Sequence, residues 1–185
     1  MAATVTLFPI GYVEEDVLAD LARRIARRCA LACHQGRALD HPAAAFDKNR
    51  RQYDARMILN QLQGSHPPAG HKHLGVTHVD LFVPILTFVF GLSRINHACA
   101  LVSLHRLRPQ FHQKTQNIGL MLDRLEKTAI HEIGHAFGLT HCLEQGCVMF
   151  AATRIDDTDA KSPDFCTLCR DVFQWRTSVP VADRP

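Results

Sequence analysis

The sequence lacks any long uninterrupted hydrophobic stretch. Its longest apolar segment, residues 79–89, is broken by Asp80, Pro84 and Thr87. A helix needs about 20 consecutive, mostly apolar residues to cross a bilayer, so we expect no membrane-spanning helix. The N-terminal run MAATVTLFPIG has no basic residue ahead of its apolar positions and is followed by an acidic stretch, residues 14–16. We therefore expect no secretory signal and predict a cytoplasmic protein.

A strong charge of one sign is also missing. The formal net charge is only +3 at pH 7, too small to indicate a nucleic-acid surface. One basic cluster does occur, formed by Arg23, Arg24, Arg27 and Arg28. The other face of its predicted helix is apolar, so a solvated helix face explains the cluster better than a phosphate-binding patch. We expect no nucleic-acid partner, and 185 residues suit a monomer with a single core.

The chain does contain a histidine-rich motif, HEIGHAFGLTH, from His131 to His141. His131 and His135 are four residues apart, so on a helix both can direct one nitrogen at the same zinc ion. Glu132 is poorly placed as a third ligand and is left free to act as a base towards a zinc-activated water. Gly138 permits the helix to stop and turn, because glycine accepts positive φ, and this brings His141 back to the metal.

The sequence around the motif predicts the helix that it requires. Apolar residues recur at steps of three and four over residues 118–137, and Asp123 and Lys127 form an acid-before-base pair four apart. Histidines that merely coincide on a surface or in a core are the alternative. The five motif residues at this spacing on a predicted helix favour a zinc site.

Four of the seven cysteines follow the histidines. Two close pairs, Cys142 with Cys147 and Cys166 with Cys169, are typical of a structural zinc site of four thiolates. The alternative is two disulfides, but a reducing cytosol favours metal binding. The other three cysteines stand apart from this cluster and are expected to be small buried hydrophobic residues, with Cys29 and Cys33 on a helix face and Cys99 in a strand.

The combination of HEIGHAFGLTHC with the later Cys147, Met149 and CTLC resembles the archaemetzincins, a metzincin-clan family of zinc metallopeptidases. The resemblance implies that His131, His135 and His141 bind a catalytic zinc, that Glu132 is the general base, and that Met149 forms an apolar floor below the metal. It also implies a second zinc on Cys142, Cys147, Cys166 and Cys169. One departure is Phe150, which stands where some metzincins carry a tyrosine near the metal.

The element order predicts an α+β fold with a mixed twisted sheet, helices on the sheet, and a small zinc-stapled C-terminal part. We expect one catalytic domain over residues 1–185, with an N-terminal subdomain at 1–138 and a C-terminal subdomain at 139–185. The sequence predicts strands at residues 4–8, 37–39, 77–83, 86–92 and 98–106. It predicts helices at residues 14–32, closed by Gly36, and at 49–62.

Two further segments have residues that could bind a metal or a substrate. Residues 65–75, rich in Pro, Gly and His, are predicted to form a loop whose His66, His71 and His73 are solvated rather than metal ligands. The resemblance to metzincins implies that residues 87–91 are an edge strand that pairs with an extended peptide substrate; the alternative is an ordinary core strand.

The predicted function is therefore zinc-dependent hydrolysis of peptide bonds in a peptide or protein substrate. Two alternatives keep the metal. A zinc-dependent hydrolase acting on RNA could share the histidine spacing, but the known class lacks the glutamate that Glu132 provides. A zinc-binding protein without turnover is the other alternative, and the retained glutamate opposes it.

Overall fold

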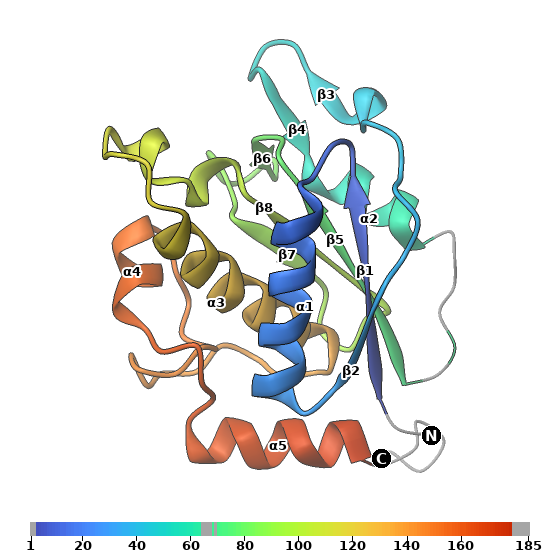
Figure 1. The fold of residues 1–185 in the computed structure, drawn as a ribbon, viewed down its shortest axis with the longest axis vertical. Coiled ribbons are helices and arrows are strands. Elements are labelled where there is room, and N and C mark those ends of the chain that lie inside the picture. The colour runs from blue at the N-terminus through green and yellow to red at the C-terminus, as the bar shows by residue number, and fades with distance from the viewer. Residues whose placement is uncertain (1–2, 64–67, 69, 179–185) are drawn as a thin grey trace.

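A five-stranded mixed sheet organises the molecule (Figure 1). The computed structural model describes residues 3–63, 68 and 70–178. The strand order is β2-β1-β5-β8-β7, in which the first four strands are parallel and β7 runs antiparallel to β8. The strands are, in that order, Ala32–Gln35, Thr4–Ile10, His71–Thr77, Cys99–Ser103 and Gly91–Ser93. The predicted α+β class with a mixed sheet is confirmed.

Helices cover both faces of this sheet. Helix α1 (Glu15–Cys29) and helix α3 (Ile118–Ala136) pack on one face, in front of the sheet in Figure 1, and α2 (Ala55–Gln63) packs on the other. Each face has its own cluster of buried apolar side chains. Burying apolar area on both faces explains why β5 and β8 are buried along almost their whole length. Helix α3 contacts β5, β7 and β8, which places the histidine motif beside the β7 edge.

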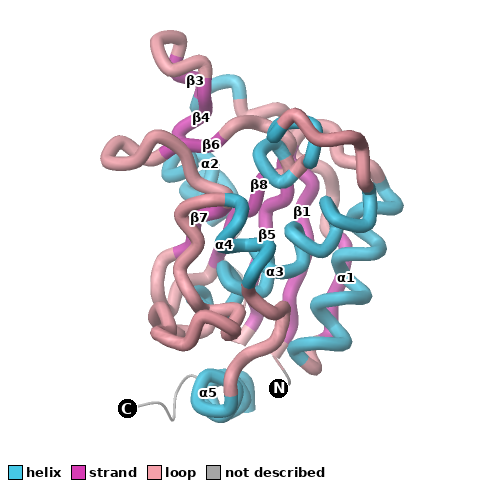
Figure 2. The backbone as a smooth tube through the Cα atoms, turned by 90° about the vertical axis from the view of Figure 1, so that its left-hand side faces the viewer, coloured by secondary structure: helices cyan, strands magenta, loops and turns pink. Residues whose placement is uncertain are grey.

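Smaller elements complete the fold. A three-stranded sheet, made of β3 (Phe46–Asp47), β4 (Gln52–Asp54) and β6 (Leu81–Phe82), projects from the main body (Figure 2). Two short helices follow the motif, α4 (Ile155–Ala160) and α5 (Thr167–Ser178). Single 3₁₀ turns occur at Ala43–Ala45, His105–Leu107 and Pro109–His112. Among the helices of the described ranges, none combines the length and the hydrophobicity needed to cross a membrane.

The first helix ends earlier than the sequence pattern predicts. Ala30 adopts the left-handed conformation with φ of 52°, and the chain reverses there into β2. Gly36 therefore follows a strand and does not close the helix, and Cys33 lies on β2, partly exposed, not on a helix face. The strand predicted at residues 37–39 is reduced to one parallel bridge between Leu39 and Ile10.

The segment around α2 also differs from its prediction. The sequence predicts one helix over residues 49–62, but β4 occupies Gln52–Asp54 and pairs with β6. The helix begins at Ala55, where the Asp54 carboxylate accepts a hydrogen bond from the Arg56 amide at 2.9 Å. A carboxylate at this position satisfies an amide that has no partner within the helix.

Strand β5 replaces much of the loop predicted at residues 65–75. His71 and His73 both lie in this strand, and His73 is only 8% exposed, so the prediction of solvated loop residues is wrong for both. His66 lies outside the described residues. The strand predicted at 77–83 is divided between the end of β5 and β6, whereas the one at 98–106 is β8 followed by a 3₁₀ turn. Of residues 86–92, only Gly91 and Leu92 join a strand.

Candidate metal centres and active-site cleft

Helix α3 places two histidine rings one turn apart. Asn117 caps its N-terminus by accepting a hydrogen bond from the Leu120 amide, and the apolar stripe behind the motif is buried against the sheet. The Nε2 atoms of His131 and His135 lie 3.1 Å apart. Residue types and spacing alone predicted this pairing, because it is a local property of the helix.

The third histidine reaches the same place through a turn at Gly138. This residue has φ of 100°, and its amide donates to the His135 carbonyl at 2.8 Å as the helix ends. The His141 ring centroid then lies 5.2 Å from that of His131 and 4.8 Å from that of His135. One ligand atom from each ring lies within 4.8 Å of the others. The three rings therefore converge on one point, as a tripod of metal ligands would.

Backbone carbonyls determine which ring nitrogens face that point. His131 Nδ1 lies 2.9 Å from the Val148 carbonyl oxygen, and His135 Nδ1 lies 2.8 Å from that of Leu139. A carbonyl can only accept, so each Nδ1 carries the proton and each Nε2 presents a lone pair. Burial lowers the pKa of both imidazoles, which keeps them neutral.

This arrangement fits zinc. Two lone pairs facing each other repel unless a cation lies between them. Tetrahedral zinc with Zn–N bonds of about 2.05 Å requires nitrogens about 3.3 Å apart, close to the observed 3.1 Å. The donor set of three neutral imidazoles is also the one found in hydrolytic zinc sites that keep a position open.

Glu132 lies beside the tripod and against the edge strand. It is buried, and burial raises the pKa of its carboxyl to about 8. The charge of a bound zinc would act in the opposite direction. A Cβ at Gly91 would lie 2.8 Å from Glu132 Cγ and 2.6 Å from the Leu101 carbonyl oxygen, so only glycine fits between them. The sequence places Gly91 in the candidate edge 87–91 but does not indicate this contact, because it joins residues far apart in the chain.

Met149 lies below the motif, as an apolar floor would. Its side chain is fully buried, and its Sδ approaches the position that a Cβ at Gly134 would occupy. Gly134 lies between the two helical histidines, so the thioether packs directly against the helix under the rings. Phe150, which follows it, donates its amide to the Cys147 carbonyl at 3.0 Å.

The four downstream cysteines also converge. Their sulfurs lie within 4.8 Å of one another, and Cys142 Sγ is 3.8 Å from Cys166 Sγ. Zn–S bonds of about 2.3 Å in a tetrahedron give S···S distances of about 3.8 Å. Backbone amides of Glu144 and Met149 donate to the sulfurs of Cys142 and Cys147 at 3.4 Å, and the first lowers the pKa of the Cys142 thiol. Such donors favour the thiolate form that zinc needs.

All seven cysteines are free thiols. The alternative of two disulfides therefore has no support in this structure. The remaining three stand apart, and Cys29 and Cys99 are buried as expected. The arrangement of the other four favours a metal cluster over two disulfides.

A cleft of about 450 Å³ connects the histidines to the edge strand. We call it the active-site cleft. One wall is formed by residues 86–93, and the opposite wall by Ala151–Thr153, Thr158 and Lys161. Thr128 and the motif histidines, with Glu132, complete the lining. An extended segment bound here would run past the histidines and along β7.

Lys161 is a residue of the cleft that sequence reasoning missed. It is only 3% exposed, and its Nζ donates to the carbonyl oxygens of Val148 at 2.8 Å and Phe150 at 3.0 Å. Burial lowers its pKa to about 8. A single lysine after a short helix has the sequence signature of a solvated residue, so no local pattern indicated this position.

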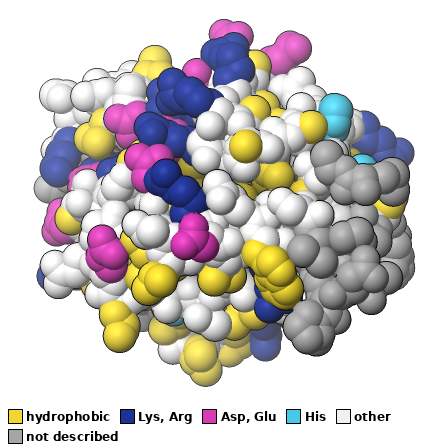
Figure 3. All heavy atoms as spheres, turned by 90° about the horizontal axis from the view of Figure 1, so that it is seen from below, with side chains coloured by type: hydrophobic (Ala, Val, Ile, Leu, Met, Phe, Trp, Pro, Cys, Tyr) yellow, Lys and Arg dark blue, Asp and Glu magenta, His cyan; other side chains and the backbone are white. Residues whose placement is uncertain are grey.

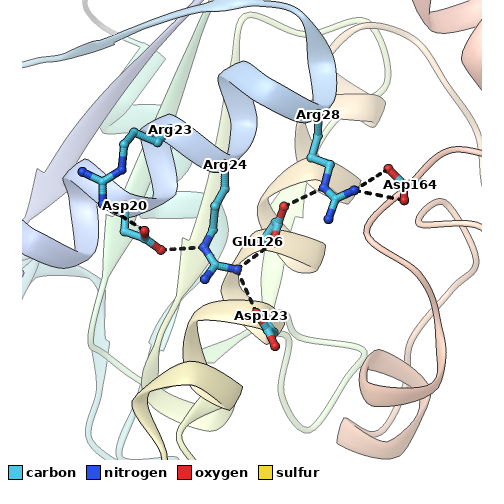
Figure 4. A network of polar contacts seen from close by, with 7 residues as sticks. All are labelled: Asp20, Arg23, Arg24, Arg28, Asp123, Glu126 and Asp164. Atoms are coloured by element: carbon cyan, nitrogen blue, oxygen red, sulfur yellow. Dashed lines mark hydrogen bonds and ion pairs between the residues drawn. The ribbon is translucent and has the colours of Figure 1, made fainter.

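The arginine cluster of α1 is not simply a solvated face (Figure 4). Arg24 pairs with Asp20, Asp123 and Glu126, and Arg28 pairs with Glu126 and Asp164. The Glu126 side chain is only 3% exposed, so these arginines neutralise a buried acid of α3. Acidic and basic side chains also lie next to one another on the face shown in Figure 3. The cluster therefore fastens α1 to the active-site helix.

Comparisons with known proteins agree with this geometry. The model of Peptidase family M54 matches residues 14–174. An archaemetzincin of Thermococcus kodakarensis is 35% identical over 171 residues, which cover 89% of this chain and 92% of the relative. A zinc-dependent peptidase from Methanocorpusculum labreanum has a similar structure, with a TM-score of 0.83, 30% identity and coverage of 91% of this chain and 99% of that one. The archaemetzincin structure from Methanopyrus kandleri gives a TM-score of 0.81 at 30% identity, with 94% and 95% covered. The chain therefore belongs to Peptidase family M54, the archaemetzincins, and is a zinc metallopeptidase.

Proposed function

We propose that the active-site cleft hydrolyses peptide bonds, with His131, His135 and His141 as zinc ligands and Glu132 as the general base. The observation that carries this proposal is the convergence of three imidazoles, two of them with their tautomer fixed, next to a carboxyl group that is not needed as a ligand. Zinc held there supplies a Lewis acid that activates water and polarises a carbonyl.

Glu132 moves the proton in this mechanism. Its carboxylate accepts a proton from the attacking water and passes it to the departing amine, so the amine leaves as a neutral group. Burial raises the affinity of the carboxyl for a proton, whereas a bound zinc would lower it. The contact with Gly91 holds the carboxyl between the histidines and the edge strand.

The β7 strand is the candidate substrate edge. It is the last strand of the sheet, pairs with β8 on one side only, and lines the cleft. An extended peptide could add to its open side through main-chain hydrogen bonds. The candidate edge is thus Gly91–Ser93, shifted from the predicted 87–91. Residues 87–90 approach it as a loop that also lines the cleft.

We propose that a second zinc, bound by Cys142, Cys147, Cys166 and Cys169, has a structural role. Four thiolates close the coordination shell, so such an ion has no open position for chemistry. Its ligands lie at both ends of the segment that carries Val148 and Met149. The metal would hold in place the carbonyl that orients His131 and the thioether that packs under α3.

The experiment that tests the catalytic assignment replaces Glu132 with Gln. This change keeps the shape of the side chain and removes the base, so we expect kcat/KM for peptide cleavage to fall by about 10²- to 10⁴-fold. Zinc content, measured by elemental analysis of purified protein, should remain unchanged. Glu15→Gln, an exposed position on α1, is the matched control and should cleave at the wild-type rate. Unchanged cleavage by zinc-loaded Glu132→Gln protein would refute the assignment of the base.

A further inference from the structure

The buried wall of the active-site cleft carries an ammonium group that forms no direct ion pair with the described residues, although the carboxyl of Glu132 acts on it from a distance. Lys161 Nζ lies in this wall, and no carboxylate of the described ranges comes within 4.0 Å of it. Buried ammonium groups are normally paired with an acid, because an isolated charge is costly to remove from water. Of the residues that line the cleft, Glu132 is the only acid, and the proposed mechanism uses it.

The hydrogen bonds of Lys161 leave one of its donors available. Two N–H groups are taken by the carbonyl oxygens of Val148 and Phe150. His131 Nδ1 lies 3.4 Å away, but it donates its own proton to Val148 and cannot also accept one. The third N–H of the ammonium is therefore free to bind an acceptor that enters the cleft.

A second unused donor lies in the same wall. Thr158, on α4, is only 1% exposed, and its hydroxyl has no hydrogen-bond partner among the described residues. The neighbouring Thr128 differs, because its hydroxyl donates to the Arg124 carbonyl within α3 at 2.9 Å. Buried hydroxyl groups are rarely left without a partner, and those that are require an explanation.

We propose that Lys161 and Thr158 together bind a carboxylate group of the peptide substrate. The inference rests on the proposed function, since it specifies which peptides the same cleft selects. A carboxylate has acceptor sites for both donors, and it supplies the direct ion pair that the ammonium lacks. It can come from an acidic side chain next to the scissile bond or from the C-terminus of a short substrate. Lys161 and Thr158 are then specificity-determining residues, and the carbonyl bonds of Lys161 hold its charge in place.

Matched peptides test this proposal on the zinc-loaded protein. Cleavage sites are first located in a mixture of peptides, and substrates are then compared that carry Glu or Gln on either side of the scissile bond. A second pair differs only in a free or amidated C-terminus. We expect kcat/KM to favour the carboxylate member of one of these pairs by about tenfold or more, because hydrogen bonds to charged groups are the strong ones. The responding pair identifies the source of the carboxylate. Equal rates within every pair would overturn the proposal.

Two variants separate recognition from support of the fold. Lys161→Met should bring the ratio of kcat/KM between the carboxylate peptide and its uncharged partner close to one. If the lysine were purely structural, its loss would lower kcat/KM for both peptides equally. Thr158→Val retains the shape of the side chain and removes only the hydroxyl that has no partner. We expect it to reduce the ratio several-fold without lowering the melting temperature. If Lys161→Met fails to fold, the test depends on Thr158→Val. An unchanged kcat/KM ratio in that variant would overturn the proposal.

A binding measurement distinguishes failure of this inference from failure of the proposed function. N-acetylglutamate amide and N-acetylglutamine amide are titrated into the zinc-loaded protein and followed by NMR. The glutamate compound should bind about tenfold more tightly than the glutamine compound in wild type, and equally in Lys161→Met. If no peptide is cleaved but this preference is present, the proposed function fails and the carboxylate site stands. If peptides are cleaved but neither assay shows a preference for the carboxylate, the carboxylate site fails and the proposed function stands.

Discussion

At the scale of single residues, the proposed metal centre depends on carbonyl groups outside its own helix. The helix spacing brings the rings of His131 and His135 together, but Val148 and Leu139 fix which nitrogen each ring presents. The Val148 carbonyl accepts from both His131 and Lys161. A loop that moved this carbonyl would free the ring to rotate or change tautomer. Partners of this kind typically change metal affinity by 10- to 100-fold when they are removed.

Gly91 provides a test of how closely the edge strand must approach the base. In Gly91→Ala, the added methyl group would meet the Leu101 carbonyl oxygen at 2.6 Å and Glu132 Cγ at 2.8 Å. The backbone oxygen cannot yield without disturbing the β7–β8 pairing, so the carboxyl must shift. We expect peptide cleavage to fall by about 10²-fold, with zinc content retained.

Gly146→Ala is the matched control for that substitution, because a Cβ there meets no atom within 4 Å. Its cleavage rate, measured on the same peptide, should equal that of wild type. A Gly91→Ala protein that cleaves at the wild-type rate would show that Glu132 tolerates displacement.

The site residues that could be predicted from the sequence are defined by local spacing, whereas those that could not are defined by contacts with distant segments. His131, Glu132 and His135 are defined by local helix spacing, and the cysteine pairs by local sequence separation. Their assignment as ligands and base remains a prediction, although the described geometry supports it. Lys161 and Gly91 matter only through contacts with distant segments. No local pattern encodes such contacts.

At the scale of elements, helix α3 was predictable because its apolar residues recur with helical period over five turns. Strand β5 was not, since both of its faces are buried and it has no alternating pattern. Its sequence HKHLGVT also begins with polar residues. The segment 86–90 has strand-like composition but lies along the cleft, with Phe90 packed into the core and Leu86 half-exposed. The composition of residues 86–90 predicts that some of them are buried. Whether they pair as a strand depends on neighbouring segments, which the sequence does not reveal.

The connection between α3 and α4 gives a prediction about stability. Arg124 is fully buried and forms two hydrogen bonds with Asp159, at 2.7 and 2.6 Å. In Asp159→Asn the guanidinium would keep its buried charge without a carboxylate. We expect the free energy of unfolding to fall by about 2–3 kcal/mol, below the usual cost of breaking a buried pair because Asp159 is partly exposed. Urea unfolding measures this. Asp123→Asn, which removes an exposed partner of Arg24, should cost less than about 1 kcal/mol.

The same pair gives this difference a pH dependence of definite sign. The hydrogen bond from Arg124 lowers the pKa of Asp159 below its ordinary value of 3.8. The ionised carboxylate therefore stabilises the folded chain fully above pH 3.8, and this contribution is lost as the pH falls through the lower folded pKa. Unfolding curves of wild type and Asp159→Asn should differ at pH 7 and converge in acid. A difference that persists unchanged at low pH would assign the effect to packing rather than to charge.

At the scale of the whole molecule, the C-terminal segment and the sheet share one core. Val148, Met149 and Phe173 belong to the same buried cluster as Leu125 and two β1 residues, Val5 and Leu7. The division at residue 138 thus separates two parts of the cleft rather than two independent cores, which supports the proposal of a single catalytic domain. Helix α5, which carries Cys169, lies at the lower end of the molecule in Figure 1.

Through this shared core, the proposed structural zinc would support the geometry of the proposed catalytic centre. We expect purified wild type to contain two zinc ions per chain, and Cys166→Ser/Cys169→Ser to contain one. Loss of the structural ion would release Cys147 and with it the Val148 carbonyl that orients His131. The double variant should therefore unfold at lower urea concentration and cleave peptides more slowly, although every cleft residue is intact. Cys33→Ser, at a partly exposed position on β2, should keep both ions and full activity. Two ions retained in the double variant would disprove the four-thiolate site, and one ion with full activity would show that the two centres act independently.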